Sequence, residues 1–266
     1  MLKVARFYWG SEYLSYFRYL TFKTFSIKNP EYDLVLYIPE NPSQEYLQKL
    51  SHRYENYFHL LKDLPRLEIR RIDLRKIGLK DNYHEAYKSN YVKWWILKNY
   101  GGWFFDTDIV WFKPVPKYPE IDYIFLAKDY NYYPSYMYSK KDIYIIDRVL
   151  SNFISHGEYK KKNFGDLGHE IMSRIYNTPQ EYIEKNPWLK VKIEDPRIIF
   201  PIAKIRDIKK IYDNRELPLC KCIGIHWFGG HPLSAEMENK LTPETYLEGN
   251  IYDIIRSVIL YTEHTV

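Results

Sequence analysis

The chain has 266 residues, with 39 basic and 34 acidic side chains and a formal net charge of +5. Its 45% hydrophobic and 27% charged fractions exclude a disordered chain, and no window of 18 uncharged apolar residues predicts a membrane-spanning helix. The charge is too evenly mixed for a nucleic-acid-binding protein, which needs a basic stripe. Only two cysteines occur, Cys220 and Cys222, which predicts a reducing compartment and no disulfide framework.

Short apolar runs alternate with helical patterns along the chain, which predicts an α/β fold. The expected strands are Lys3–Trp9, Asp33–Ile38, Leu67–Leu74, Trp103–Phe112, Tyr123–Ala127, Val191–Phe200 and Cys222–Phe228. The expected helices are Tyr13–Ser26, Pro42–Leu61, Asn82–Lys98, Ile143–Ile154, Asp166–Tyr176 and Pro243–Tyr261. No sequence boundary for a second domain is visible.

The 28 tyrosines are the unusual feature of the composition. A tyrosine offers a flat apolar face and a hydroxyl, which suits stacking on sugars and bases. Codon usage explains such an excess equally well. One aromatic set recurs at helical spacing before the stop at Gly101-Gly102, and we expect it in the core. Its members are Tyr83, Tyr87, Tyr91 and Trp94.

Two acids, Asp106 and Asp108, follow a run of three aromatic residues. Because alternate residues of a strand share one face, both carboxylates are expected to point the same way. Like charges at an apolar strand end favour a bound cation such as Mg²⁺ or Mn²⁺, which can also neutralise a departing diphosphate. An Asp-x-Asp triplet is also common in turns and solvated strand edges, so metal binding is a hypothesis at this point.

Three consecutive segments resemble the DXD-containing sugar-binding region of glycosyltransferase family 32. They are Ser89–Lys93, Ile96–Gly102 and Phe105–Asp108. That group includes yeast-type mannosyltransferases and bacterial capsular sugar transferases, and the glucosylating clostridial toxins share the segment. Shorter similarities lie at Phe7–Gly10, Asn29–Tyr32 and Gly224–Trp227, which resemble the family's first strand, its asparagine-proline step and its closing strand.

The resemblance implies a GT-A fold, in which a central mixed, mostly parallel sheet is flanked by helices. It implies a single catalytic domain over 1–266, with a nucleotide-sugar half at 1–112 and an acceptor half at 113–266. Asp106 and Asp108 would be the catalytic acids and metal ligands, with Mn²⁺ or Mg²⁺ as the cofactor. Asp108 would bind the ion directly, and Asp106 through water or through sugar hydroxyls.

The helix before the acids departs from the family pattern Ser-Asp-x-x-Arg at two positions. Asn90 replaces the aspartate and Lys93 replaces the arginine. The two residues are three apart, so they share a helix face. Asn90 keeps hydrogen-bonding capacity without charge, and Lys93 keeps the charge without the bidentate fork. We expect both to contact the donor, with a donor sugar that differs from the usual one, or else to form an ordinary solvated face.

Further donor-site candidates lie near strand ends, where open α/β sheets bind ligands. Trp9 is a candidate for stacking on the nucleotide base, with core packing as the alternative. His226 is a candidate third metal ligand or hydrogen-bond partner of the diphosphate, with a buried structural histidine as the alternative. His231 and Ser234 follow on the next loop, within reach of phosphate oxygens.

The candidate residues for acceptor binding rest on less specific sequence features. Asp166, at a position where the family has a Gly-Pro-Glu helix start, is the candidate base if the enzyme inverts, and otherwise a helix cap. Glu170 is the second candidate. Tyr133 and Tyr136 belong to a tyrosine cluster that would contact the acceptor sugar or pack within the fold. Cys220 and Cys222 are interpreted as structural, because no further cysteine completes a zinc site.

The resemblance thus implies a metal-dependent, retaining transferase that moves a sugar from a UDP- or GDP-linked donor to a glycan, a glycolipid or another hydroxyl acceptor. A nucleotide-sugar-binding or hydrolysing relative and a non-catalytic carbohydrate-binding protein are the alternatives. A cytoplasmic location is expected, peripheral to a membrane if the acceptor is lipid-linked. No nucleic-acid partner is expected.

Overall fold

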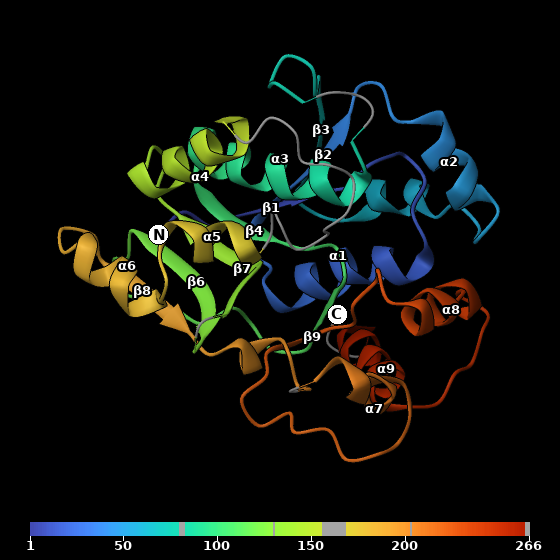
Figure 1. Ribbon diagram of the computed structural model, residues 1–266. Helices are drawn as coiled ribbons and strands as arrows, with labels where there is room; N and C mark the ends of the chain where they lie inside the picture. The colour runs from blue at the N-terminus through green and yellow to red at the C-terminus, as the bar shows by residue number, and fades with distance from the viewer. Residues whose placement is uncertain (80–82, 130, 156–168, 203, 264–266) are drawn as a thin grey trace.

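The computed structural model describes residues 1–79, 83–129, 131–155, 169–202 and 204–263. Its centre is a seven-stranded sheet with the strand order β3-β2-β1-β4-β7-β6-β8 (Figure 1). The strands are β1 (Val4–Tyr8), β2 (Asp33–Pro39), β3 (Leu67–Ile72), β4 (Gly102–Phe105), β6 (Tyr123–Lys128), β7 (Asn131–Ser139) and β8 (Val191–Glu194). Pairing is parallel from β3 to β4 and between β6 and β8, whereas β7 is antiparallel to both neighbours.

Helices cover both faces of this sheet, with α3 and α4 on one side and α1 on the other (Figure 1). The helices are α1 (Tyr16–Lys28), α2 (Gln44–Ser51), α3 (Glu85–Tyr100), α4 (Tyr144–Ser155), α5 (His169–Ile175), α6 (Pro179–Lys185), α7 (Lys209–Tyr212), α8 (Pro232–Lys240) and α9 (Asn250–Glu263). Short 3₁₀ helices lie at Phe58–Asp63, Pro196–Ile198 and Ile205–Asp207. The predicted class, a mixed and mostly parallel sheet flanked by helices, is confirmed.

The alternation of side chains along β1 explains how the sheet separates two cores. Tyr8 packs into the core shared with α3, α4 and α5, where Trp94 is 2% exposed. Phe7 points to the opposite face and meets Phe22 of α1 at 4.9 Å between ring centroids. Tyr87, Tyr91 and Trp94 all lie in the first core, as their helical spacing predicts.

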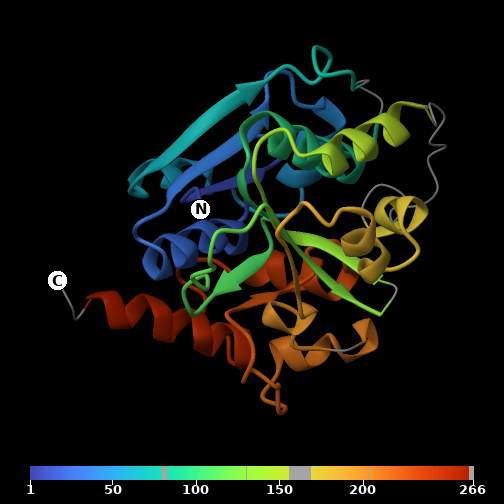
Figure 2. The same ribbon diagram turned by 90° about the vertical axis from the view of Figure 1, so that its left-hand side faces the viewer.

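A third core joins the carboxyl-terminal segment to α1. Phe17 of α1 stacks on Trp227 with ring centroids 4.2 Å apart and an interplanar angle of 5°. Residues from α7 and α9 complete this core, and Figure 2 shows α9 in red beside α1 in dark blue. The last segments of the chain are therefore fixed against the helix that follows β1. No described helix has the length and hydropathy needed to cross a membrane.

The expected strand Trp103–Phe112 is in fact two strands that belong to different sheets. β4 ends at Phe105, and β5 (Ile109–Trp111) begins a two-stranded antiparallel sheet with β9 (Gly224–His226). Asp106, Thr107 and Asp108 form the bend between them. The expectation that both acids alternate on one strand face is wrong, because the apolar runs on either side of this bend imitate one continuous strand.

Other differences follow from turn and proline chemistry. The expected helix Pro42–Leu61 is divided into α2 and the 3₁₀ helix Phe58–Asp63. The expected strand Val191–Phe200 ends at Glu194, because Pro196 opens a 3₁₀ helix. β7 and α8 have no counterpart among the expected elements. A proline inside β7, Pro134, weakens the strand pattern there.

Candidate metal and donor site

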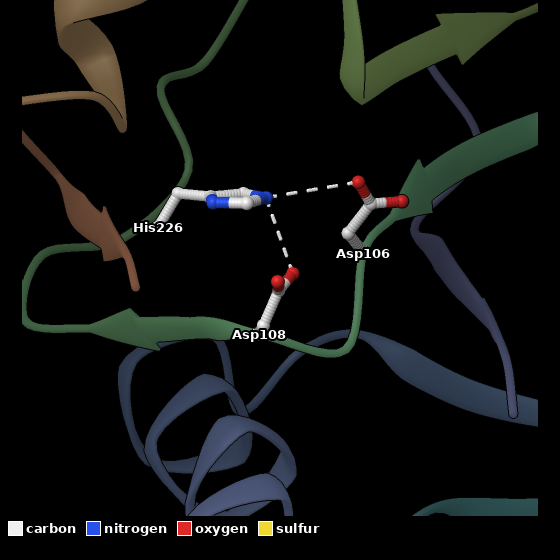
Figure 3. Close-up of side chains that lie close together, drawn as sticks. All are labelled: Asp106, Asp108 and His226. Atoms are coloured by element: carbon white, nitrogen blue, oxygen red, sulfur yellow. Dashed lines mark ion pairs between the residues drawn. The ribbon is translucent and has the colours of Figure 1, made fainter. Parts of the chain in front are cut away.

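Asp106, Asp108 and His226 converge at the carboxyl end of β4 (Figure 3). One candidate ligand atom from each residue lies within 4.8 Å of the others. The acids flank the bend between β4 and β5, and His226 ends β9, which pairs with β5 so that Ile109 lies opposite His226. A strand pair that joins segments more than a hundred residues apart therefore completes the cluster.

Asp108 is held by backbone groups of the segment that follows β9. Gly229 N donates to Asp108 Oδ2 at 2.8 Å, and Trp227 N donates to the Asp108 carbonyl at 2.9 Å. The other carboxylate oxygen, Oδ1, lies 3.1 Å from His226 Nε2. Asp108 is thus oriented before any ligand binds, since both carboxylate oxygens have a fixed partner.

The hydrogen bonds of His226 define its neutral form in this arrangement. Its Nδ1 accepts from Phe228 N at 3.2 Å, so the ring proton of the neutral imidazole lies on Nε2. Nε2 is 3.1 Å from Asp108 Oδ1 and 3.8 Å from Asp106 Oδ2 (Figure 3). His226 is therefore a hydrogen-bond donor toward the acids here. Coordination of a metal through Nε2 requires the ring to give up the Phe228 contact.

Asp106 forms a buried ion pair with Lys93 of α3. The Nζ–Oδ1 distance is 2.9 Å, and Lys93 is only 1% exposed. Burial disfavours the charged form of Asp106, but the Lys93 cation and the His226 hydrogen bond outweigh it and hold the pKa of Asp106 well below its ordinary value. The Asp106 carboxylate is therefore ionised at neutral pH, as a metal ligand must be.

The chemistry of these side chains fits a hard divalent cation. Two carboxylates and one imidazole supply the oxygen and nitrogen atoms that Mg²⁺ and Mn²⁺ accept. Asp106 keeps one oxygen, Oδ2, on the side of His226 while the other pairs with Lys93. The cluster can therefore provide one carboxylate oxygen from each acid to an ion between them.

Arg18 of α1 was not among the expected site residues, yet it touches the bend that carries the acids. Its Nη1 donates to Thr107 Oγ1 at 3.1 Å. The available signal was its place in the helix pattern. Arg18 lies four residues after Leu14 and four before Phe22, both fully buried, so this spacing could have indicated a cation on a buried face.

Trp9 directly follows β1, as expected, but its ring is largely covered. It is 9% exposed, its Nε1 donates to the Tyr13 carbonyl at 2.8 Å, and the Arg18 guanidinium lies 4.2 Å from its ring centroid. Tyr46 of α2 packs at 6.0 Å. Stacking of a nucleotide base on Trp9 would therefore use only the small part of its side chain that stays exposed.

Two other candidates for donor binding, Ser234 and His231, have structural roles in the segment that follows β9. Ser234 is fully buried, and its Oγ donates to the Trp227 carbonyl at 2.6 Å. Its hydroxyl is enclosed in this structure, and the expected contact of Ser234 with phosphate oxygens stays a prediction. His231 is the N-cap of α8, and its Nδ1 accepts from Leu233 N at 3.2 Å. Asn90 is half-buried on α3, one turn before Lys93.

The two tyrosines expected to bind the acceptor also differ in how deeply they are buried. Tyr136 is fully buried, and its hydroxyl lies 3.1 Å from that of Tyr118, so it packs within the fold here and its expected acceptor contact stays a prediction. Tyr133 is half-buried against Phe200, whose ring packs at 4.8 Å on His226. The ring of Phe200 therefore lies between Tyr133 and His226 of the cluster.

Glu170 and Asp166 complete the set of expected site residues. Glu170 forms an i, i+4 ion pair with Arg174 along α5. Asp166 lies outside the described residues. The role of either residue as the base of an inverting reaction stays a prediction.

Residues 18–126 match the family model of the glycosyltransferase sugar-binding region containing the DXD motif. The match includes Asp106 and Asp108, so the resemblance expected from the sequence is confirmed for this segment. The segment that carries the two acids of the cluster is therefore similar to a glycosyltransferase sugar-binding region. No curated protein matches the chain.

Three solved glycosyltransferase structures are similar to 69–97% of this chain. PaToxG glycosyltransferase is 16% identical with a TM-score of 0.49, over 97% of this chain and 87% of that chain. Galactosyltransferase LgtC, in complex with donor and acceptor sugar analogues, is 9% identical with a TM-score of 0.42, over 90% and 84%. The UDP-bound glycosyltransferase domain of the YGT toxin is 10% identical with a TM-score of 0.42, over 69% of each chain.

Proposed function

We propose that the protein is a metal-dependent glycosyltransferase of the GT-A type. It moves a sugar from a nucleoside diphosphate donor to a hydroxyl group of a glycan or glycolipid. The observation that carries this proposal is the convergence of Asp106, Asp108 and His226 within 4.8 Å, inside and beside the segment that matches the DXD-containing region.

The cofactor would be Mn²⁺ or Mg²⁺, held by Asp108 and Asp106. A bound divalent ion supplies Lewis-acid stabilisation of the diphosphate as it leaves. Asp108 is suited to direct ligation because Gly229 N and His226 already orient its oxygens. Asp106 shares its charge with Lys93, so it would bind the ion with its free oxygen, through water, or hold hydroxyls of the donor.

The remaining donor contacts would come from side chains around the cluster. The Nε2–H of His226 would donate to a diphosphate oxygen, which is the alternative to a role as third metal ligand. Lys93 and Asn90 would contact the donor sugar from α3, and Trp9 the base. His231 would contribute to phosphate binding from the start of α8. The nucleotide half would be residues 1–112.

The acceptor would bind over residues 113–266, with Tyr133 nearest the cluster. We propose that the anomeric configuration is retained, so that the departing phosphate takes the proton of the acceptor and no protein base is required. The ion pair between Glu170 and Arg174 along α5 supports this proposal for one of the two candidate bases.

The experiment that tests this function compares wild type with Asp108→Asn, using labelled UDP- and GDP-linked sugars with and without a glycan acceptor. We expect Mn²⁺-dependent transfer in the wild type and a loss of about 100-fold or more in the variant, the size of effect seen when one transition-state contact is removed. Full activity in the presence of EDTA would contradict the metal role.

A second candidate function is hydrolysis or binding of the nucleotide sugar without glycan transfer. The substitution of Asn90 and Lys93 for the family's acid and arginine favours it, because these positions contact the donor sugar in the family. Donor cleavage at the same rate with and without every acceptor tested would support this alternative. A purely carbohydrate-binding protein would instead bind no nucleoside diphosphate with or without Mn²⁺.

A further inference from the structure

Arg18 is a buried cation that the proposed chemistry does not use. Its guanidinium is enclosed by Trp9 and Trp227, whose ring centroids lie 4.2 and 5.0 Å from Cζ. Its Nε lies 2.9 Å from Oε1 of Glu238, a residue of α8 that is 1% exposed. Removing two charged groups from water costs free energy that offsets their attraction, so this buried ion pair by itself adds little to the stability of the fold.

The guanidinium reaches the bend between the two acids. Its Nη1 donates to Thr107 Oγ1 at 3.1 Å and to the Thr107 carbonyl at 3.4 Å. Thr21, one turn further along α1, donates to the same carbonyl at 3.1 Å. The residue between Asp106 and Asp108 is therefore held from α1, with Arg18 bonded to its side-chain hydroxyl and both Arg18 and Thr21 bonded to its carbonyl.

The same guanidinium lies against the backbone that orients Asp108. A Cβ atom on Gly229 would lie 2.3 Å from Arg18 Nη2, so Arg18 and this glycine are in direct contact. Gly229 N is the donor to Asp108 Oδ2. Arg18 thus contacts both the bend that carries the acids and the loop that holds one of them in place.

We propose that Arg18 is a positioning residue for the carboxylate pair. Glu238 and the two indole rings hold the guanidinium, and the guanidinium fixes Thr107 and Gly229. The separation of Asp106 and Asp108, and hence their affinity for a divalent cation, depends on this contact. The inference rests on the proposed function in that it assumes the acids bind a metal ion.

A neighbouring arginine provides a matched control. Arg53 forms an ion pair with Oε2 of the same Glu238 at 3.4 Å, and its guanidinium packs near Tyr54 rather than the bend. Substitution of Arg53 therefore also weakens the ion pairing of Glu238, through its second carboxylate oxygen, Oε2. A purely structural role for the Glu238 cluster would make Arg18 and Arg53 equivalent.

The test measures Mn²⁺ binding by calorimetry on the full chain without nucleotide. Arg18→Lys keeps the charge opposite Glu238 but loses the planar fork that also reaches Thr107. We expect the dissociation constant for Mn²⁺ to rise about 10- to 100-fold, the range for groups that orient metal ligands. Arg53→Lys should leave it within about twofold. Circular dichroism and the melting temperature establish that each variant is folded.

Thr107→Val provides a second route, because it removes the hydroxyl that Arg18 contacts and leaves both acids and Arg18 in place. If the two residues act together, Arg18→Lys combined with Thr107→Val should weaken Mn²⁺ binding little more than either substitution alone. Thr107→Val decides the question alone if Arg18→Lys does not fold.

Unchanged Mn²⁺ affinity in folded Arg18→Lys and Thr107→Val would overturn the inference and leave the proposed function intact. An equal loss in Arg53→Lys would also overturn it, because the effect would then be one of general packing. Wild type that binds no Mn²⁺ would overturn the metal site itself, and the positioning role with it.

Discussion

Lys93 Nζ lies 2.9 Å from Asp106 Oδ1, so the first acid of the cluster already has a buried cation beside it. Lys93 occupies the position where the resembled family has an arginine that contacts the donor. In this chain the lysine therefore has a structural partner as well as its proposed ligand. Its ammonium and a bound divalent ion would both stabilise the charge on Asp106.

Lys93→Met should lower the free energy of unfolding by about 1–3 kcal/mol, because it leaves the Asp106 carboxylate without its cation. Mn²⁺ should restore part of this loss, since the ion neutralises the same carboxylate. The measurement is urea unfolding with and without Mn²⁺. Lys88→Met is the control, because buried Lys88 pairs with Glu85 on the same helix. A gain from Mn²⁺ that is no larger in Lys93→Met than in Lys88→Met would contradict the prediction.

Gly229→Ala should destabilise the fold by about 1–3 kcal/mol and weaken Mn²⁺ binding. Its new Cβ would lie 2.3 Å from Arg18 Nη2 and 3.0 Å from the Trp227 ring, so the loop that donates to Asp108 must shift. Gly230→Ala is the matched control, since nothing lies within 4 Å of its Cβ position. Melting temperature and Mn²⁺ calorimetry of the two variants test this. Equal behaviour of both would show that the loop tolerates the added methyl group.

His226→Gln distinguishes a hydrogen-bond donor from a metal ligand. Glutamine keeps an N–H donor near the position of Nε2, so a donor role predicts Mn²⁺ affinity close to that of wild type. His226→Ala should then lower the rate of sugar transfer about 10- to 100-fold through loss of the contact to the leaving group. If His226 is a ligand, both variants lose Mn²⁺ affinity to the same extent. Calorimetry and donor turnover together separate these outcomes.

The buried tyrosines predict a loss of stability at high pH. Burial raises the pKa of Tyr32 to about 12, and it raises the pKa values of Tyr123 and Tyr136 further. In the unfolded chain these hydroxyls ionise near pH 10, whereas in the folded protein they keep their protons. Stability is therefore fully present below pH 10 and falls as the pH rises through 10 toward 12, by about 1.4 kcal/mol per pH unit for each such tyrosine.

Urea unfolding from pH 8 to 11 measures this decline, and tyrosinate absorbance at each pH reports which hydroxyls ionise in the native state. The buried set should ionise only as the protein unfolds. Complete ionisation of all tyrosines near pH 10 in a protein that remains folded would refute the prediction.

Local patterns in the sequence determined the helix that precedes the acids and the motif that contains them. The helix that contains Tyr87, Tyr91 and Trp94 is specified by its own periodicity, and the resemblance at Asp106 and Asp108 is confirmed by the family match. These features need only neighbouring residues, because a helix face and a short motif are properties of one segment. The α/β class followed from the same local patterns.

Tertiary structure decided how the site is assembled. His226 reaches the acids because β9 pairs with β5, a contact between segments that no local pattern relates. The same packing buries Ser234 and Tyr136, which the sequence had placed among the ligand-binding residues, and turns Arg18 toward Thr107. Burial of a polar group depends on what covers it from distant parts of the chain, so only the folded arrangement separates a binding side chain from one that holds the scaffold.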